Sequence, residues 1–299
     1  MEYVLKTEGL TKIYSKTRVV NNVDMIIRPG DIYGFVGKNG AGKTTFIRMI
    51  LGLTGITDGS FKLFDGENIS SARKRVGSLI ESPAIFRNMT ASQNLDIYCT
   101  MLGADKKTIP HILKTVGLSD TGKKKSGDFS LGMKQRLGIA IALIGNPDFL
   151  ILDEPINGLD PTGIVDVREL LIELKNQGKT IFISSHILGE LEKIATRYGI
   201  ISSGKLVEEI TSAELSEKCG SRTVITVSDT AKSIEIISKI LDIHSENIEY
   251  DKNNIFVKSK IDNIGELTNA LFNAGVTVSG ISNDENSAEK YFIRKMEGK

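Results

Sequence analysis

The chain has 299 residues, with 38 lysine and arginine residues against 37 aspartate and glutamate residues, so its net charge is close to zero. This balance argues against a protein dedicated to nucleic acid, which usually carries a basic face. With 40% hydrophobic residues, the chain has the composition of an ordinary globular protein, and it is long enough for one large domain or two smaller ones.

The sequence offers no membrane or secretion signal of its own. Its first ten residues, MEYVLKTEGL, lack the basic start and apolar core of a secretory signal. No run reaches the roughly 18 consecutive apolar residues that a membrane helix needs. The two cysteines, Cys99 and Cys219, have no metal or redox spacing and indicate a reducing compartment. We therefore expect a cytosolic protein that meets the membrane only through a partner.

A nucleotide phosphate site is predicted within residues 31–53, DIYGFVGKNGAGKTTFIRMILGL. A short apolar strand precedes the pattern G-x-x-x-x-G-K-[ST], and a helix with one apolar face follows it. The glycines let backbone N–H groups turn towards phosphate oxygens, and the helix N-terminus adds positive potential. Lys43 is expected to reach the β- and γ-phosphates of ATP, and the Thr44 hydroxyl to bind Mg²⁺. The predicted nucleotide ligands of this loop are Gly37, Asn39, Gly40, Gly42, Lys43, Thr44 and Thr45.

A second half of the site is predicted within residues 147–161, PDFLILDEPINGLDP. The apolar run 149–152 is typical of a buried parallel strand, and it ends on Asp153 and Glu154. Two adjacent carboxylates are costly there unless a cation is close, and Mg²⁺ is the natural candidate. We expect Asp153 to bind the ion through water and Glu154 to act as general base on the attacking water. Two solvated carboxylates without a ligand are the alternative.

A helix and a further strand follow these carboxylates. Asp160 as N-cap and Pro161 at the first position predict the start of the helix, and Gly178 its end. The next strand, KTIFISSH, places His186 at its tip, where the imidazole could contact the γ-phosphate and the attacking water. The position of His186 alone favours a structural role, in which the ring is hydrogen-bonded within the fold and has no catalytic function.

These motifs, in this order, resemble the ATP-binding subunits of ABC transporters. The segment DFSLGMKQRLGIAIAL, residues 128–143, precedes the Asp-Glu strand and resembles the L-S-G-G-Q signature, with three departures from that consensus. A helix N-terminus with a serine is a ready anion site. The resemblance implies that Ser130 and Gly132 close on the γ-phosphate bound by a second subunit, and that His186 is the switch histidine. It also implies that Tyr14 stacks on adenine, although a plain strand tyrosine is the alternative.

The resemblance covers about residues 1–218 and implies the fold. We expect an α/β core with a mostly parallel sheet, an antiparallel β subdomain built from residues 4–14 and 59–66, and a helical subdomain at about 83–145. The remaining residues, 219–299, alternate as β-α-β-β-α-β and suggest a small α+β, ferredoxin-like module without a catalytic cluster.

Glu81 points to a smaller group within the ABC transporter ATPases. In most ABC cassettes a glutamine stands at this strand end and binds Mg²⁺ through its side-chain oxygen. An ionised glutamate can only accept hydrogen bonds and suits a hard cation, so we expect Glu81 to be a metal ligand. Glutamate within LIESPAIFRNMTASQNL resembles the ATPases of bacitracin-type and lantibiotic-immunity exporters. An isolated divergence in some other exporter cassette is the alternative.

The sequence therefore predicts the ATPase subunit of an ABC exporter that protects a cell from lantibiotic or bacitracin-like peptides. Two copies are expected to pair around two Mg-ATP molecules and to bind a permease at the cytoplasmic face of the membrane, without nucleic acid as a partner. A generic exporter of other cargo, a soluble ABC protein of translation or repair, and a binding module with a dead site are the rivals.

Overall fold

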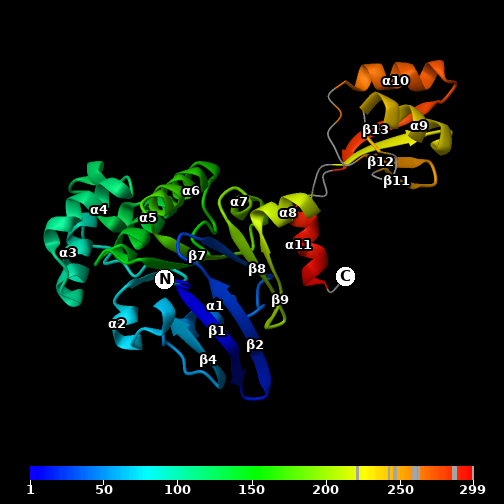
Figure 1. The fold of residues 1–299 in the computed structure, drawn as a ribbon. Coiled ribbons are helices and arrows are strands. Elements are labelled where there is room, and N and C mark those ends of the chain that lie inside the picture. Colours follow the sequence, from blue (N-terminus) through cyan, green and yellow to red (C-terminus); the bar gives the residue numbers. More distant parts are fainter. Residues whose placement is uncertain are drawn as a thin grey trace. The chain divides into compact units, whose positions relative to one another are not determined.

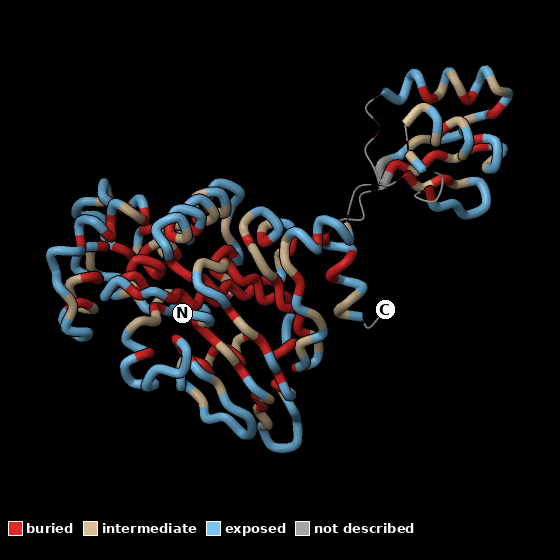
Figure 2. The backbone as a smooth tube through the Cα atoms, viewed as in Figure 1, coloured by how far each residue is buried: buried red, intermediate tan, exposed pale blue. Residues whose placement is uncertain are grey.

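The computed structural model describes residues 1–219, 222–241, 243–244, 248–257, 261, 263–284 and 288–297. The chain forms two compact units, one of residues 1–212 with the C-terminal segment from residue 292, and one of residues 213–291. Each unit has its own hydrophobic core, visible in Figure 2 as buried segments inside an exposed outer layer.

A six-stranded sheet forms the centre of the first unit (Figure 1). Its strand order is β5-β6-β7-β3-β8-β9, and neighbouring strands run parallel except for the last pair. The mostly parallel sheet predicted from the sequence is confirmed. The strands are β3 (Ile32–Val36), β5 (Val76–Leu79), β6 (Phe149–Asp153), β7 (Thr180–Ser185), β8 (Arg197–Ser202) and β9 (Lys205–Thr211).

The strands that lead to the predicted site are the most deeply buried. Every residue of β3, β6 and β7 is buried, as expected for parallel strands that are covered on both faces and therefore read as continuous apolar runs. The ring centroids of Phe35 and Phe46 lie 5.1 Å apart, and those of Phe35 and Phe182 lie 5.3 Å apart. Such aromatic contacts each add about 0.5–1.5 kcal/mol beyond area burial. They hold β3, β7 and α1 (Lys43–Ile50) together directly beneath the phosphate loop.

A three-stranded antiparallel sheet lies on the other side of α1. Its order is β2-β1-β4, formed by β1 (Leu5–Tyr14), β2 (Thr17–Ile27) and β4 (Asp58–Leu63). The predicted pairing of the first strand with residues 59–66 is confirmed, and β2 adds an edge strand. Side chains of α1 belong to one hydrophobic cluster with residues from both sheets.

Three helices of the first unit lie in the segment that was predicted to be a helical subdomain, and the others follow strands of the sheets. The segment predicted as helical, residues 83–145, contains α3, α4 and α5 and no strand. The helix α6 begins as predicted, because Asp160 Oδ1 accepts a hydrogen bond from the Gly163 N–H at 3.0 Å and Pro161 follows it. The helices are α2 (Ile69–Arg73), α3 (Ala91–Leu102), α4 (Ile109–Thr115), α5 (Leu131–Ala142), α6 (Pro161–Asn176) and α7 (Leu188–Leu191).

The second unit contains a four-stranded antiparallel sheet of order β11-β12-β10-β13. The predicted β-α-β-β-α-β order is confirmed, and Asp251 pairs with Asn254 across the predicted hairpin turn. A ferredoxin-like identity for this module stays a prediction. The elements are β10 (Arg222–Val227), α9 (Thr230–Leu241), β11 (Ile248–Asp251), β12 (Asn254–Val257), α10 (Ile264–Asn273) and β13 (Val278–Asp284).

The last helix, α11 (Ala288–Met296), changes the division expected from the sequence. The boundary expected at residue 218 assigns all of 219–299 to the C-terminal module. In the structure the first compact unit contains residues 1–212 and also the segment from residue 292 onwards. The segment from residue 292 belongs to the first unit because of long-range contacts that the local sequence pattern does not predict. Phe292 is fully buried with its ring centroid 5.3 Å from that of Tyr198, and Ser202 Oγ donates a hydrogen bond to the Met296 carbonyl at 2.8 Å.

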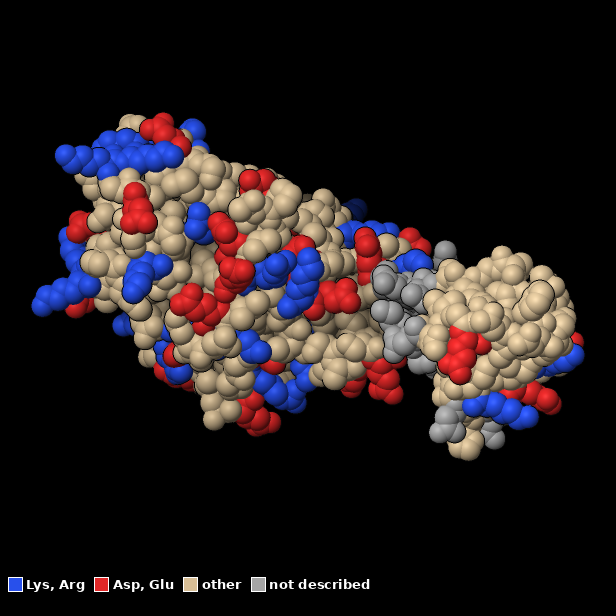
Figure 3. All heavy atoms as spheres, turned by 90° about the horizontal axis from the view of Figure 1, so that it is seen from above, with Lys and Arg blue, Asp and Glu red and all other residues tan. Residues whose placement is uncertain are grey.

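Among the described residues, no helix has both the length and the apolar character needed to cross a bilayer. On the face drawn in Figure 3, lysine and arginine atoms are interspersed with aspartate and glutamate atoms. This mixture matches the near-equal count of basic and acidic residues in the sequence.

Candidate active site

The loop between β3 and α1 requires glycine at two positions. Gly42 has φ of 105°, and a Cβ built there would lie 2.4 Å from the Val19 carbonyl oxygen. A Cβ on Gly37 would lie 2.6 Å from the Ile201 carbonyl oxygen. Both approaches are closer than any side chain permits, so glycine is required at these positions. Asn39 and Gly40 are exposed at the tip of the loop, open to a ligand.

Lys43 begins α1, and its side chain folds back over the loop. Only 5% of the residue is exposed. Its ammonium group donates to the Gly37 carbonyl at 2.7 Å and lies 3.2 Å from Glu154 Oε1. A buried ammonium group needs such acceptors because an unpaired buried charge is costly. Phosphate oxygens arriving in the loop can take the place of these acceptors.

Thr44 and Asp153 bring the two halves of the predicted site together. The Thr44 hydroxyl donates to Asp153 Oδ2 at 2.8 Å, although the two residues are 109 positions apart. Asp153 is 1% exposed, and its other carboxylate oxygen accepts a hydrogen bond from the Ser184 hydroxyl. Two hydroxyl donors thus satisfy this buried carboxylate from α1 and from β7.

Glu154 connects the lysine to the histidine. Its carboxylate lies 3.2 Å from Lys43 Nζ through Oε1 and 2.8 Å from His186 Nδ1 through Oε2. Its backbone has φ of 50°, a left-handed conformation that costs a non-glycine residue about 1–3 kcal/mol and is enriched at functional sites. The Glu154 N–H donates to the carbonyl and the hydroxyl of Ser184, at 3.1 and 3.0 Å, which holds the residue in this conformation.

Ser184 is a residue that the sequence analysis missed. Its hydroxyl contacts the Asp153 carboxylate and accepts from the Glu154 N–H, so it fixes both acidic residues at once. The available signal was a pair of polar residues, Ser184 and Ser185, at the end of an otherwise apolar strand and just before His186. Fully buried hydroxyls at that point indicate hydrogen-bond partners on the neighbouring strand.

Glu81 follows β5 and does not contact the threonine–aspartate pair in this structure. Its backbone is also left-handed, with φ of 57°. Its carboxylate Oε1 lies 2.6 Å from Arg48 Nη2 on α1; the Glu81 side chain is largely exposed and that of Arg48 partly so. The predicted metal ligand is therefore placed beside the helix that follows the phosphate loop, in an ion pair that the sequence analysis did not foresee.

The remaining predicted ligands lie on other elements. Ser130 is the N-cap of α5 and accepts a hydrogen bond from the Met133 N–H at 3.2 Å, and Gly132 lies in the first turn. Tyr14 ends β1 and is 45% exposed, with its hydroxyl 3.2 Å from Thr54 Oγ1 and Lys12 Nζ 4.8 Å from its ring centroid. Thr45 is half-buried in the first turn of α1.

Among the residues that the structure describes, no group of three or more histidine, cysteine, aspartate or glutamate side chains is arranged to hold a metal ion by itself. A hydroxyl and a carboxylate side by side, as in Thr44 and Asp153, instead suit a hard cation that takes its other ligands from phosphate oxygens and water.

Comparison with known proteins identifies the family. Residues 20–157 match the ABC transporter family. The bacitracin transport ATP-binding protein BcrA of Bacillus licheniformis is 43% identical over 304 residues, which cover 100% of this chain and 99% of that protein. The chain belongs to the ABC transporter ATP-binding family. The resemblance noted in the sequence is confirmed, and the chain is the ATP-hydrolysing subunit type of this family.

Another relative agrees with this identification, and solved structures share the fold. The lantibiotic transport ATP-binding protein SrtF of Streptococcus pyogenes is 46% identical to the ABC ATPase over 207 residues, covering 69% of this chain and 90% of that protein. The structure of cbiO1 from Clostridium perfringens, part of the ABC transporter complex cbiONQ, has a TM-score of 0.67 at 24% identity and covers 81% of this chain and 97% of that one. A structure titled as the ATP-binding subunit of an ABC transporter has a TM-score of 0.63 at 26% identity, covering 72% of this chain and 92% of that one.

Proposed function

We propose that this ABC ATPase powers the export of bacitracin-like or lantibiotic peptides and thereby protects the cell that makes it. The observation that carries the proposal is the full-length match to a bacitracin transport ATP-binding protein, which includes the C-terminal unit as well as the cassette. A second bacitracin transport ATP-binding protein, from Enterococcus faecalis, is 41% identical over 100% of this chain and 98% of its own length.

Glu154 is proposed as the general base. Its carboxylate lies 3.2 Å from Lys43 and 2.8 Å from His186, and the contact with His186 can keep its orientation when phosphate oxygens replace it at Lys43. A carboxylate held in this way can accept the proton of a water molecule that attacks the γ-phosphate. His186 is proposed to keep the carboxylate in place and to contact the γ-phosphate, and Lys43 to offset the charge that develops on the phosphate oxygens.

The adjacent oxygens of Thr44 and Asp153 support the assignment of a magnesium site. The Thr44 hydroxyl and the Asp153 carboxylate are already within 2.8 Å of each other, with one of the carboxylate oxygens fixed by Ser184. Bound there, Mg²⁺ would supply positive charge to the β- and γ-phosphates. Glu81 is proposed as a third ligand, which requires its carboxylate to leave Arg48.

The second copy of the chain and a permease are proposed as partners. A related cassette, MJ0796, is described as dimeric in a post-hydrolysis state with ADP and phosphate, with a TM-score of 0.62 to this chain. We propose the same kind of pairing here, with Ser130 and Gly132 at the exposed start of α5 meeting the nucleotide of the other copy. Because the cargo must cross a membrane, the pair is proposed to bind a permease at the cytoplasmic face.

Growth inhibition in the native host tests the proposal. A deletion strain is compared with strains restored by the wild-type protein, by Glu154→Gln or by Glu169→Gln, an exposed and chemically equal change on α6. The panel holds bacitracin, lantibiotics and unrelated drugs. We expect the deletion and Glu154→Gln strains alone to be sensitised, and only to the peptides.

The outcome also separates the alternatives. Sensitivity to other compounds and not to these peptides would leave an exporter of different cargo. The absence of a permease from the protein purified under mild detergent, together with unchanged drug sensitivity, would favour a soluble ABC protein and contradict the proposed transport function.

A further inference from the structure

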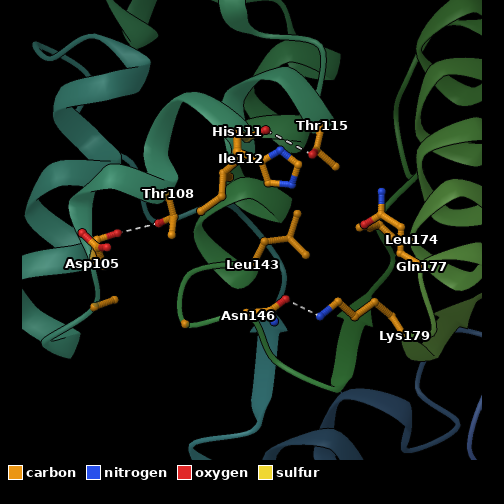
Figure 4. A pocket seen from close by; sticks show the side chains of 12 residues that line it. Asp105, Thr108, His111, Ile112, Thr115, Leu143, Asn146, Leu174, Gln177 and Lys179 are labelled. Carbon is orange, nitrogen blue, oxygen red and sulfur yellow. Dashed lines mark hydrogen bonds between the residues drawn. The ribbon is translucent and has the colours of Figure 1, made fainter.

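A cavity of about 480 Å³ lies in the first unit, away from the nucleotide-site residues. Its walls come from α4, from the turn that leads into β6 and from the end of α6 with the first residue before β7 (Figure 4). Gly145 and Asn146 precede β6 and Lys179 precedes β7, so these residues are at the amino ends of the two strands. The catalytic candidates Asp153 and His186 are at or beyond the carboxyl ends. The cavity is therefore a separate feature.

Lys179 is built into the cavity by the end of α6. Gly178 has φ of 88°, its N–H bonds to the Lys175 carbonyl at 2.8 Å, and the Lys179 N–H bonds to the Leu174 carbonyl at 3.1 Å. These two bonds form a Schellman motif, which ends the helix and fixes the direction of the next residue. As a result, the Lys179 side chain lies along the cavity wall and points towards Asn146 (Figure 4).

The Lys179 ammonium group has room for a further acceptor. The residue is only 9% exposed, and burial lowers the pKa of its ammonium group from the ordinary lysine value. Asn146 Oδ1 accepts one hydrogen bond from it at 2.6 Å, and among the described residues no carboxylate forms an ion pair with it. An ammonium group has three N–H donors, so the neutral amide of Asn146 leaves two of them without an acceptor among the described residues. The Asp148 carboxylate, which is ion-paired with Arg75, acts on the Lys179 charge without forming an ion pair with it.

The rest of the cavity combines an apolar wall with further polar side chains, among them the acidic Asp105. Ile112, Leu143 and Leu174 line it and are buried. The His111 ring lies on the α4 side of the cavity (Figure 4), and no hydrogen bond from a described residue engages its nitrogens. A cavity of this size, apolar with a few convergent polar groups, has the character of a small-molecule site.

We propose that this cavity binds a small amphipathic carboxylate, with the carboxylate on Lys179 and the hydrocarbon part against Ile112, Leu143 and Leu174. The carboxylate supplies the charge-assisted acceptor that Asn146 does not. The apolar walls gain from covering a hydrocarbon chain, because each buried CH₂ group removes apolar surface from water. The chemistry selects an anion over a neutral or cationic molecule of equal length.

Tryptophan fluorescence offers a direct test, because the protein contains no tryptophan of its own. Gln177→Trp places one reporter at an exposed position that lines the cavity. Sodium octanoate, octan-1-ol and octylammonium chloride, each at millimolar concentration, are titrated against this full-length protein. We expect a saturable change with octanoate and at least tenfold weaker responses with the other two compounds. Tyr250→Trp, in the second unit, is the control reporter and should not respond.

Lys179 is then changed in the reporter protein. Lys179→Met should weaken octanoate binding at least tenfold, Lys179→Arg should largely retain it, and Lys175→Met, one turn earlier on α6, should leave it unchanged. Equal responses to octanoate, octanol and octylammonium in the Gln177→Trp protein would overturn the proposal, and this comparison stands even if Lys179→Met fails to fold. Unchanged octanoate affinity in a folded Lys179→Met protein would overturn it as well.

Discussion

Arg48 Nη2 lies 2.6 Å from Glu81 Oε1, so the glutamate that follows β5 is paired with the helix that follows the phosphate loop. The two residues stand 33 positions apart, and Glu81 is largely exposed while Arg48 is partly exposed. Glu81 has the left-handed backbone that only nine non-glycine positions among the described residues adopt, and Glu154 is another of them. The ion pair therefore holds the Glu81 carboxylate, a proposed metal ligand, beside Arg48. We expect metal binding to move this carboxylate away from Arg48.

Release of this pair should ease magnesium binding. In Arg48→Met the Glu81 carboxylate no longer has to leave an ion pair, so we expect the Mg²⁺ concentration for half-maximal ATP binding to fall. Exposed ion pairs contribute about 0.2–1 kcal/mol, so the fall should be no more than about fivefold. Calorimetric titration in a Glu154→Gln background, which suppresses turnover, gives the value.

Two variants complete this test. Glu81→Gln should raise the Mg²⁺ requirement, and Lys74→Met, an exposed basic residue after α2, should not change it. If Glu81→Gln raises the requirement while Arg48→Met leaves it as it was, the ion pair does not restrain the ligand.

Loss of the proposed general base should separate ATP binding from turnover. Glu154→Gln keeps the size of the side chain and a polar contact with His186, so ATP affinity should stay within about threefold of the wild-type value. General base catalysis contributes about 10²–10⁴-fold, so phosphate release should fall at least a hundredfold. Equilibrium nucleotide binding and phosphate release are measured on the same preparation, with Glu169→Gln as control. Turnover at the wild-type rate would remove Glu154 from the mechanism.

The C-terminal segment should affect nucleotide affinity through the phosphate loop. Lys38 Nζ in the loop lies 3.5 Å from Glu297 Oε1, directly after α11. Glu297→Gln removes a negative charge from beside the loop, so ATP affinity should rise by up to about fivefold at low salt. The gain should shrink at 0.5 M salt, because salt screens exposed charges. Glu192→Gln, an exposed change elsewhere, should show no gain. A gain that is independent of salt would indicate a cause other than this charge.

Glu209 should make folding stability depend on pH. Glu209 is exposed as a whole residue, but desolvation of its carboxyl raises the pKa above the ordinary value, and the carboxyl accepts a hydrogen bond from the buried Tyr33 hydroxyl at 2.7 Å. Because the folded pKa is the higher one, deprotonation costs more in the folded state than in the unfolded state. The contribution is thus fully present below the unfolded pKa and is lost as the pH rises through the folded pKa.

Glu209→Gln keeps an acceptor for Tyr33 and cannot ionise. Its thermal midpoint should therefore exceed that of the wild-type protein at pH 7, and the difference should vanish towards pH 4. Melting curves between these pH values measure the effect, with Glu192→Gln as the control because it makes the same change at another exposed glutamate. A midpoint that is lower by the same amount at every pH would mean that hydrogen-bond geometry, not charge, dominates at this position.

Several parts of the fold and site follow from short stretches of sequence. The phosphate loop could be predicted because its glycines, lysine and threonine act within eight consecutive residues between a strand and a helix. The ends of α6 could be predicted because Asp160 and Gly178 satisfy helix termini locally. The buried strands β3, β6 and β7 could be predicted because an apolar run without alternation suits only strands covered on both faces.

Other features depend on contacts between distant segments. Ser184 meets Asp153 across 31 positions, Arg48 meets Glu81 across 33, and Lys38 meets Glu297 across 259. Which polar side chains become partners is decided by strand order and helix packing, since many arginines and glutamates in the sequence have equal capacity to pair. The Lys179 cavity also depends on tertiary packing, because α4 and the end of α6 form walls around this lysine. The sequence near Lys179 predicts only the start of a strand.

The sequence by itself thus determined the family of this protein and its candidate site, because the groups proposed to bind phosphate and the two acidic residues each lie in short motifs with local geometry. Only the tertiary structure decided how those groups are held and what else surrounds them. It placed Ser184 beneath both carboxylates, paired Glu81 with Arg48, and returned α11 to the first unit through Phe292. The physical reason is that burial and long-range hydrogen bonding are properties of the packed chain and have no counterpart in any single segment.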